Sequence, residues 1–214
     1  MKEKHYKHKV AVIICWFGDC PWYFEFFVHS VRYNRSIDFI IVTDSAIVVP
    51  LPSNIRIINL SFGEIKVLAF QKLGFKVSIE NAYKLCDFKP AYGLLFEDFL
   101  TGYDFWAHGD LDIIFGNIRH FLTAELLDEY DVIALRHDYL TGYFTLYRNN
   151  AKLNNLFKIS KHYKTEFANA RHFCFDETNF CFNQFSNQVH YSRVTGEIES
   201  MTHVVKKMDE VKYI

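Results

Sequence analysis

The sequence predicts an α/β sandwich with a mostly parallel central sheet. Short apolar runs alternate with segments of helical pattern, which is typical of parallel strands joined by helices. The first apolar run, at 9–17, is continuous, as expected for a strand that is buried on both faces. The chain has 214 residues, half of them hydrophobic, which is enough for one domain with a buried core.

The N-terminal half is predicted to contain three strands and two helices. Pro21 follows the first strand and suits the first turn of a helix that we expect to end near Asn34. Ser61 and Glu64 have the spacing of a capping box, and Gly74 suits the position just past the helix that they begin. The three predicted strands lie at 9–17, 38–43 and 55–60.

The C-terminal half continues the alternation. A helix is predicted from Phe88 to about Leu100, with Pro90 in its first turn, and Thr123 is expected to cap another helix. The last thirty residues are weakly patterned, so whether they pack or flex stays open. Since no repeat and no linker occurs, we expect a basic tail at 1–8 and a single domain at 9–214. Further strands are predicted at 103–107, 131–135 and 143–147, and further helices at 151–160 and 176–184.

Composition excludes several classes of protein. The formal net charge of −1 argues against nucleic-acid binding, and 18% aromatic residues argue against disorder. Five cysteines without a CxxC pair indicate free thiols in a reducing cytosol, not a disulfide framework or a zinc site. No apolar run approaches the ~20 residues that span a bilayer. We therefore expect a cytoplasmic protein whose basic tail makes at most peripheral contact with the inner face of the membrane; the oligomeric state stays open.

Two carboxylates one residue apart, Asp110 and Asp112, follow the apolar strand predicted at 103–107. Carboxylates at the end of a buried strand need a positive partner, and a divalent cation bound to a diphosphate would supply one. On extended backbone, side chains at i and i+2 point the same way, so both could face one Mn²⁺ or Mg²⁺ ion. The alternative is a surface turn with two solvated aspartates.

Other strand ends are expected at the same edge of the sheet. Trp16 or Phe17 could stack on a base, and Gly18 would let the backbone approach it, although Trp16 could equally be a core residue. Asp44 ends the second strand, where it could accept hydrogen bonds from a ribose or base, or simply cap a turn. Open α/β sheets bind ligands at the carboxyl ends of their strands, which favours a binding site here.

Five further positions are candidates for contacts with a ligand. Asp87 and Lys89 lie at the start of the helix predicted near Phe88, where Lys89 could pair with phosphate oxygens or belong to a salt-bridged cap on the surface. Gly142 precedes a strand and could bring backbone close to a sugar. Asp176 and Glu177 open a segment of helical pattern, so either the helix dipole or a catalytic role would explain them. Neither a Walker loop nor GxGxxG is present, which disfavours a P-loop enzyme or a dinucleotide dehydrogenase.

Taken together, these motifs resemble those of bacterial GT-A-type glycosyltransferases, in particular a poorly characterised group associated with surface-polysaccharide genes. The resemblance runs from about residue 9 to 180, and the stretches around Asp87 and Asp110 are its most specific parts. The stretches that carry it are 13–18, 42–44, 84–93, 102–119, 140–144 and 175–177.

The resemblance implies a GT-A-like, Rossmann-related αβα sandwich that transfers a sugar, as a hexosyltransferase, in surface-polysaccharide or lipopolysaccharide synthesis. It implies a nucleotide-diphospho-sugar donor, a saccharide or lipid-linked saccharide acceptor, and Mn²⁺ or Mg²⁺ on Asp110 and Asp112. By the same analogy Lys89 contacts the donor, and Asp176 or Glu177 lies near the transferred sugar. His203 is the candidate third metal ligand, and His108 and His203 are the two histidines that we consider as members of the site. The chain ends soon afterwards, so a shortened acceptor region is expected.

Two alternative functions remain. Asp110-Leu111-Asp112 is similar to the nucleophile loop of haloacid-dehalogenase-like phosphatases, but those enzymes carry it after the first strand, whereas several strands precede it here. A noncatalytic module that binds a nucleotide sugar is the other alternative, and the short C-terminus favours it. Metal-dependent transfer or hydrolysis of a donor would distinguish an enzyme from such a module.

Overall fold

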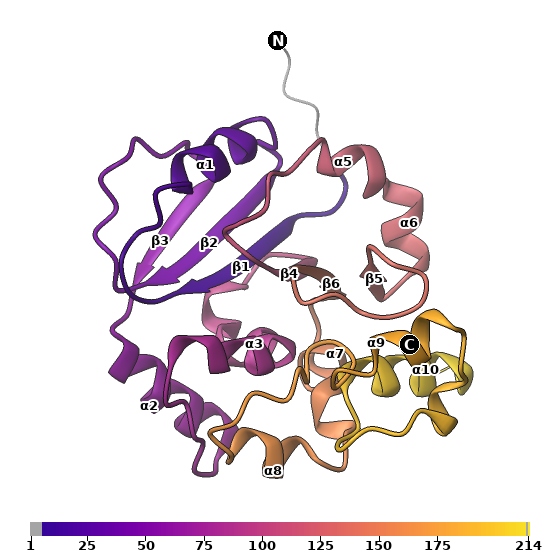
Figure 1. Cartoon of the computed structure of the whole chain (residues 1–214). Coiled ribbons are helices and arrows are strands. Elements are labelled where there is room, and N and C mark those ends of the chain that lie inside the picture. Colours follow the sequence, from indigo (N-terminus) through magenta and orange to yellow (C-terminus); the bar gives the residue numbers. More distant parts are fainter. Residues whose placement is uncertain (1–5, 213) are drawn as a thin grey trace.

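The computed structural model describes residues 6–212 and 214, which form a six-stranded sheet in the order β3-β2-β1-β4-β6-β5 (Figure 1). Parallel pairing joins β3 to β2, β2 to β1 and β1 to β4, whereas β6 pairs antiparallel with β4 and with β5. The predicted mostly parallel sheet is confirmed. The strands are β1 Val10–Trp16, β2 Ile37–Thr43, β3 Ile55–Asn59, β4 Phe105–Gly109, β5 Val132–Ala134 and β6 Phe144–Arg148.

Helices cover both faces of this sheet, so the predicted sandwich is also confirmed (Figure 1). Alternate residues of β1 enter opposite cores: Ala11 and Ile13 face one, and Val12 and Ile14 the other. One core is closed by α1 Phe24–Arg32, α5 Ile118–Phe121 and α6 Ala124–Glu129. The other is closed by α2 Phe62–Leu73, α3 Leu85–Phe88, α4 Tyr92–Leu95, α7 Ala151–Asn154, α8 Tyr163–Phe167 and α10 Met201–Glu210.

Local signals placed the ends of two helices correctly. Ser61 Oγ accepts a hydrogen bond from the Glu64 N–H at 3.2 Å, and the Glu64 carboxylate accepts one from the Ser61 N–H at 2.7 Å, as the capping box predicted. Gly74 ends α2 in the left-handed conformation, with φ +77°. Thr123 caps α6 through the N–H of Leu126, which confirms its predicted role.

The predicted helix from Phe88 to Leu100 is wrong. The segment is divided into short pieces, because it wraps around the core and buries residues on several sides instead of along one stripe. Gly93 shows how tight this wrapping is, since a Cβ there would lie 2.5 Å from the ring of Trp106. Beside α3 and α4 the pieces are the 3₁₀ turns η1 Ala82–Lys84, η2 Lys89–Ala91 and η3 Glu97–Phe99.

The helix predicted at 176–184 is also wrong, because residues 175–180 form turns and only α9, Phe182–Ser186, is helical.

The expectation that Asp110 and Asp112 lie on extended backbone is likewise corrected: β4 ends at Gly109, and the chain turns immediately afterwards. The weakly patterned C-terminus packs through α10, which buries Met201 and Val204. The predicted helix at 151–160 divides into α7 and the turn η4 Leu156–Ile159; η5 is Tyr191–Arg193.

Residues 1–5 of the predicted basic tail lie outside the described residues. At its end, the Lys7 ammonium and the His8 ring both contact the Asp128 carboxylate at 2.7 Å. Within residues 6–212 and 214, no helix is both long enough and apolar enough to cross a membrane.

Candidate functional site

The order of the strands reverses between β1 and β4. The chain first builds outward from β1 through β2 to β3, and then crosses back to place β4 on the other side of β1. In open α/β sheets, ligands bind outside the carboxyl ends of the strands at such a switch point. Trp16 ends β1 and Gly109 ends β4, so the segments that follow these two residues form the candidate site.

Lys89 connects three parts of this site. Its ammonium lies 2.5 Å from Oδ1 of Asp110, 2.8 Å from the carbonyl oxygen of Gly142 and 3.9 Å from Oδ2 of Asp176. Burial alone would lower the pKa of Lys89, but the Asp176 and Asp110 carboxylates outweigh it and raise this pKa, so the side chain is a cation. The Lys89 side chain is only 6% exposed. In this arrangement the Lys89 ammonium holds the Asp110 and Asp176 side chains in fixed orientations.

Both backbone polar groups of Gly142 form hydrogen bonds with side chains of the site. Its N–H donates to Oε1 of Glu177 at 2.6 Å, and its carbonyl oxygen accepts from Lys89 and lies 3.1 Å from Nδ1 of the buried His108. A Cβ at this position would lie 2.5 Å from Oδ2 of Asp176. Glycine is therefore required by the close approach of the neighbouring carboxylates, not by a special turn.

The variant Gly142→Ala is expected to lose about 1–3 kcal/mol of unfolding free energy, because the new methyl group must displace the buried Asp176 side chain. Urea denaturation followed by linear extrapolation measures this loss. Gly116→Ala is the matched control, since nothing lies within 4 Å of a Cβ at that position. Equal stability of the two variants would contradict the crowding argument.

Asp176 is held in place by Asp87. The Asp87 carboxylate accepts the backbone N–H of Phe175 at 2.8 Å and that of Phe173 at 2.9 Å, which fixes the segment that carries Asp176. Burial raises the pKa of Asp176 well above its usual range; Lys89 opposes this shift, and nearby Glu177 adds to it. Asp87 itself is fully buried and engaged with protein groups. This placement does not fit the predicted donor contact of Asp87 and gives it a positioning role.

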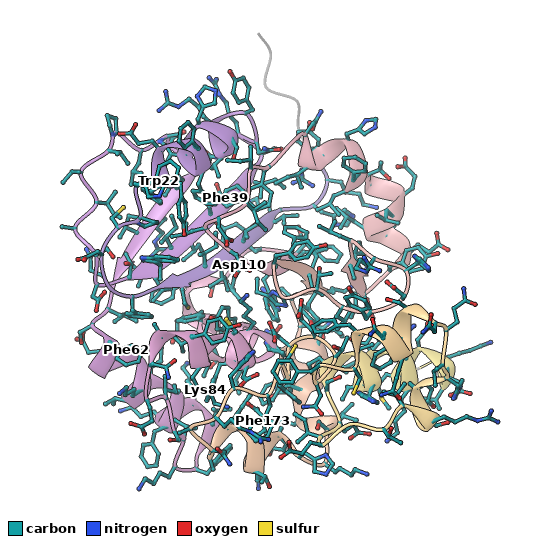
Figure 2. The ribbon with its side chains drawn as sticks, viewed as in Figure 1. Trp22, Phe39, Phe62, Lys84, Asp110 and Phe173 are labelled. Atoms are coloured by element: carbon teal, nitrogen blue, oxygen red, sulfur yellow. The ribbon has the colours of Figure 1, made fainter. Side chains whose placement is uncertain are left out.

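A buried ionic cluster lies behind Asp87, and no sequence motif indicates all of its members. The Lys84 ammonium lies 2.9 Å from Asp87 Oδ2, 2.8 Å from Glu166 Oε1 and 2.8 Å from the Arg171 carbonyl oxygen. Figure 2 shows Lys84 and Phe173 together in the layer below the sheet. Glu166 was not predicted because it lies 82 residues from Lys84 and follows no motif.

Asp110 and Asp112 are the most accessible acids of the site. Asp112 is exposed, and the Asp110 side chain, labelled in Figure 2 at the lower edge of the sheet, is 34% exposed. Burial raises the pKa of Asp110, with Lys89 opposing and Asp112 adding to the shift. Burial also raises the pKa of Tyr23, and both aspartates raise it further, so Tyr23 lies within their electrostatic reach. Sequence inspection had overlooked this tyrosine.

The predicted third metal ligand, His203, is not brought to this pair. His203 belongs to the capping box of α10, where its Nδ1 lies 2.8 Å from Ser200 Oγ. Throughout the described part of the chain, no three His, Cys, Asp or Glu side chains are grouped so that they could hold a metal ion. Mg²⁺, however, is commonly bound by one or two carboxylates together with substrate phosphates and water. Asp110 and Asp112 fit that kind of site.

The structure brings together two predicted residues at the exit of β1. Gly18, with φ +104°, donates its N–H to Asp44 Oδ1 at 2.9 Å, and the Ser45 hydroxyl donates to the Gly18 carbonyl oxygen. Trp16 donates its Nε1–H to the carbonyl oxygen of Asp19 at 2.9 Å and is half-buried. Phe17 is also half-buried and packs against Phe62. Their contacts with a base or ribose stay predictions.

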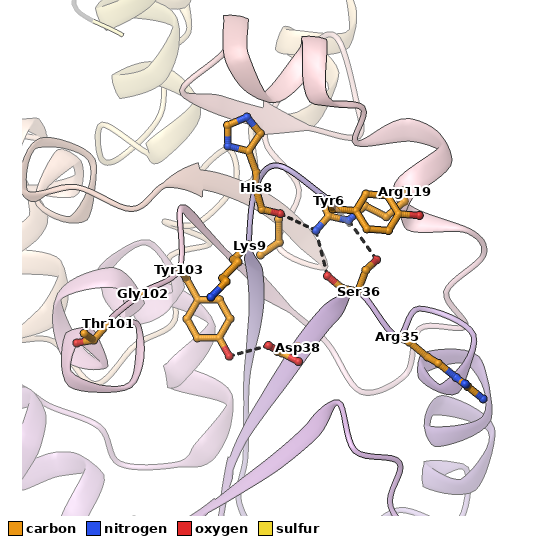
Figure 3. Close-up of a pocket in the computed structure, with 11 residues that line it drawn as sticks. Tyr6, His8, Lys9, Arg35, Ser36, Asp38, Thr101, Gly102, Tyr103 and Arg119 are labelled. Carbon is orange, nitrogen blue, oxygen red and sulfur yellow. Dashed lines mark hydrogen bonds between the residues drawn. The ribbon is translucent and has the colours of Figure 1, made fainter. Parts of the chain in front are cut away.

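A separate pocket of about 400 Å³ lies at the opposite edge of the sheet (Figure 3). It is lined by residues near the amino ends of the strands, among them Val10 of β1, Asp38 of β2 and Tyr103 before β4. The Tyr103 hydroxyl donates to the Asp38 carboxylate at 2.8 Å. This pocket is therefore distinct from the site around Asp110.

Comparisons with known proteins give one family and several distant structures. Residues 12–211 match a protein family described as a family of unknown function, DUF6625. A search of curated proteins found no match. Similar solved structures include the galactosyltransferase LgtC in complex with donor and acceptor sugar analogues, at 12% identity and a TM-score of 0.37, over 92% of this chain and 70% of LgtC. The apo form of the glycosyltransferase GlyE from Streptococcus pneumoniae TIGR4 matches at 18% identity and a TM-score of 0.32, over 71% of this chain and 38% of GlyE.

Proposed function

The chain belongs to the DUF6625 family, and for it we propose the activity of a metal-dependent glycosyltransferase. It would move a sugar from a nucleotide-diphospho-sugar donor to a hydroxyl of a saccharide or lipid-linked saccharide. One observation carries the proposal: Asp110 and Asp112 follow β4 at the switch point of the sheet, in front of the Lys89–Asp176 pair.

Asp110 and Asp112 would hold Mn²⁺ or Mg²⁺ together with the donor diphosphate. Such an ion, when bound, stabilises negative charge on the departing nucleotide. Lys89 supports this by fixing the orientation of Asp110 through its 2.5 Å contact. Because the Lys89 ammonium is already bonded to Asp110 and Gly142, we propose that it positions these groups and reaches the donor through Asp110.

The exit of β1 would receive the nucleoside part of the donor. A hydrogen bond joins Gly18 to Asp44. The half-buried rings of Trp16 and Phe17, close to Gly18 in the chain, could stack on the base. The donor sugar would then lie beside Asp110, in front of the Gly142 loop, whose close approach to the Asp176 and Glu177 carboxyl groups holds these acids in place.

Asp176 and Glu177 would serve the transfer itself. Glu177 accepts the Gly142 N–H and the Cys174 thiol proton, so it fixes the floor of the site. Burial raises the pKa of Asp176, so this carboxyl group can hold a proton beside Lys89, whereas the partly buried Glu177 is the acid that an acceptor hydroxyl can reach. We place the reaction in the cytoplasm, at the inner face of the membrane where a lipid-linked acceptor is used.

The proposal predicts metal-dependent donor binding. In a thermal-shift assay with UDP-, GDP-, CMP- and dTDP-sugars, one nucleotide family should stabilise the protein in the presence of Mn²⁺ and not in its absence. Asp112→Asn should abolish the shift without affecting the apo protein, because Asp112 is exposed and removing its charge lessens the repulsion on Asp110. Asp104→Asn, an exposed aspartate before β4, is the control.

Each other result has a definite meaning. Shifts that are equal with and without Mn²⁺, or that persist in Asp112→Asn, would contradict the metal site. Donor binding without metal-dependent release of the nucleoside diphosphate would favour a noncatalytic binding module. Hydrolysis of a phosphomonoester through an acyl-phosphate on Asp110 would instead favour the phosphatase alternative, although Asp110 follows the fourth strand of the chain.

A further inference from the structure

Three aromatic side chains form a row on the layer below the sheet, with two exposed rings on either side of a largely buried histidine. The rings of Tyr83 and His172 lie 4.7 Å apart, and those of His172 and Phe180 5.7 Å apart, both edge to face. Tyr83 is 66% exposed and Phe180 60% exposed. The row joins η1 to the loop at 172–180, which are distant in the sequence. Neither burial nor core packing accounts for two large rings held in solvent at this position.

The backbone conformation that presents Phe180 is an unfavourable one. Phe180 has φ +61°, a region that bulky L-residues rarely adopt, and the preceding Asn179 has φ +54°. The conformation is imposed by Asn179, whose side chain donates to the Phe173 carbonyl oxygen at 2.9 Å and accepts the N–H groups of Glu197 and Ile198. The exposed ring of Phe180 is therefore held on a strained backbone.

The row is continuous with the candidate site. Burial raises the pKa of Tyr83, with Cys86 and Asp176 adding to the shift, so the phenol lies within electrostatic reach of the Asp176 carboxylate. His172 lies 3.1 Å from the carboxylate of Asp87, which positions Asp176. At the other end of the loop, the Cys174 thiol donates to Glu177. A ligand lying on the row would therefore have its edge next to Glu177, with the buried Asp176 carboxyl group behind it.

We propose that Tyr83, His172 and Phe180 form the acceptor subsite and bind a pyranose ring through its apolar C–H face. Exposed aromatic rings recognise ligands with one apolar face, and the partly buried Glu177 carboxylate beside the row can accept a hydrogen bond from a sugar hydroxyl. This deepens the proposed glycosyltransferase function and rests on it: the acceptor would be a saccharide with a six-membered ring, bound beside Glu177 before transfer.

The test is saturation-transfer NMR of the full chain with methyl β-galactoside, methyl β-glucoside and lactose, in the absence of donor. We expect saturation of ring protons of at least one pyranoside by wild-type protein, with at least a fivefold loss of signal in Phe180→Gly and in Tyr83→Ala. Phe180→Gly should also keep or raise the melting temperature, because glycine adopts a positive φ without strain. Phe121→Ala is the matched control: Phe121 is 69% exposed and lies edge to face on His120, but belongs to α5 on the other side of the sheet.

Absence of signal with all three pyranosides, or an equal signal in wild type and Phe180→Gly, would overturn the subsite. Its failure is separable from failure of the proposed function, because donor binding is measured independently by the Mn²⁺-dependent thermal shift. Donor binding without pyranoside binding would refute only the subsite. Pyranoside binding that depends on Phe180 without any donor shift would refute the transferase and retain a saccharide site.

Discussion

Replacing Lys84 by methionine is expected to lower the unfolding free energy by about 3–5 kcal/mol, because two buried carboxyl groups lose the cation that they share. Lys84 is completely buried and is the cation shared by Asp87 and Glu166. Its removal takes away the lysine partner of Asp87, whose side chain is completely buried. Burial already raises the pKa of Glu166 well above its usual range, so in the variant Glu166 would be expected to stay protonated.

Equilibrium urea denaturation measures this loss, and Lys72→Met provides the control. Lys72 also contacts two carboxylates, Glu97 at 2.8 Å and Asp98 at 2.9 Å, but this network is on the surface. Surface ion pairs contribute about 0–1 kcal/mol, so the control variant should lose at most that much. A loss in Lys84→Met no greater than in Lys72→Met would show that the buried cluster is not needed for stability.

The cluster also explains how stability and the candidate site are coupled. Asp87 binds Lys84 on one side and the backbone N–H groups of Phe173 and Phe175 on the other, so the ion pair fixes the loop that carries Asp176. The Lys84→Met variant is therefore expected to lose most of its metal-dependent release of nucleoside diphosphate from the donor, while it keeps a larger share of its secondary structure.

Much of the sheet could be predicted from the sequence because its signals are local. The continuous apolar run of β1 and the reciprocal pair Ser61 and Glu64 each specify their own structure within a few residues. Asp110 was placed correctly at the end of a central strand for the same reason. The turn that follows Gly109 was not anticipated, since it depends on how β4 meets the Gly142 loop.

The parts that sequence could not supply depend on contacts between distant segments. Glu166 meets Lys84 across 82 residues, and Asn179 is held in a positive φ by backbone groups of Glu197 and Ile198. These contacts override the helical pattern at 176–184, where the acids at its start suggested a helix dipole. The site therefore consists of predicted residue types placed by interactions that have no local pattern.

The variant Asp176→Asn is expected to separate activity from stability. Without the carboxylate, turnover of the donor should fall by about 10²–10⁴-fold, the usual contribution of a positioned acid or base. Metal-dependent release of the nucleoside diphosphate measures this, with donor binding followed in parallel by thermal shift. Unchanged turnover would show that Asp176 only fills space beside Gly142.

The stability of Asp176→Asn should depend on pH in a defined direction. Because burial raises the folded-state pKa of Asp176, the folded protein retains a proton that the unfolded chain releases above about pH 4. Wild-type stability should therefore decrease, relative to the variant, as the pH rises from that value through the raised folded-state pKa, and the two proteins should differ least in acid. If the variant were instead the less stable protein at neutral pH, the attraction between Asp176 and Lys89 would outweigh the cost of burial, and the raised pKa would be refuted.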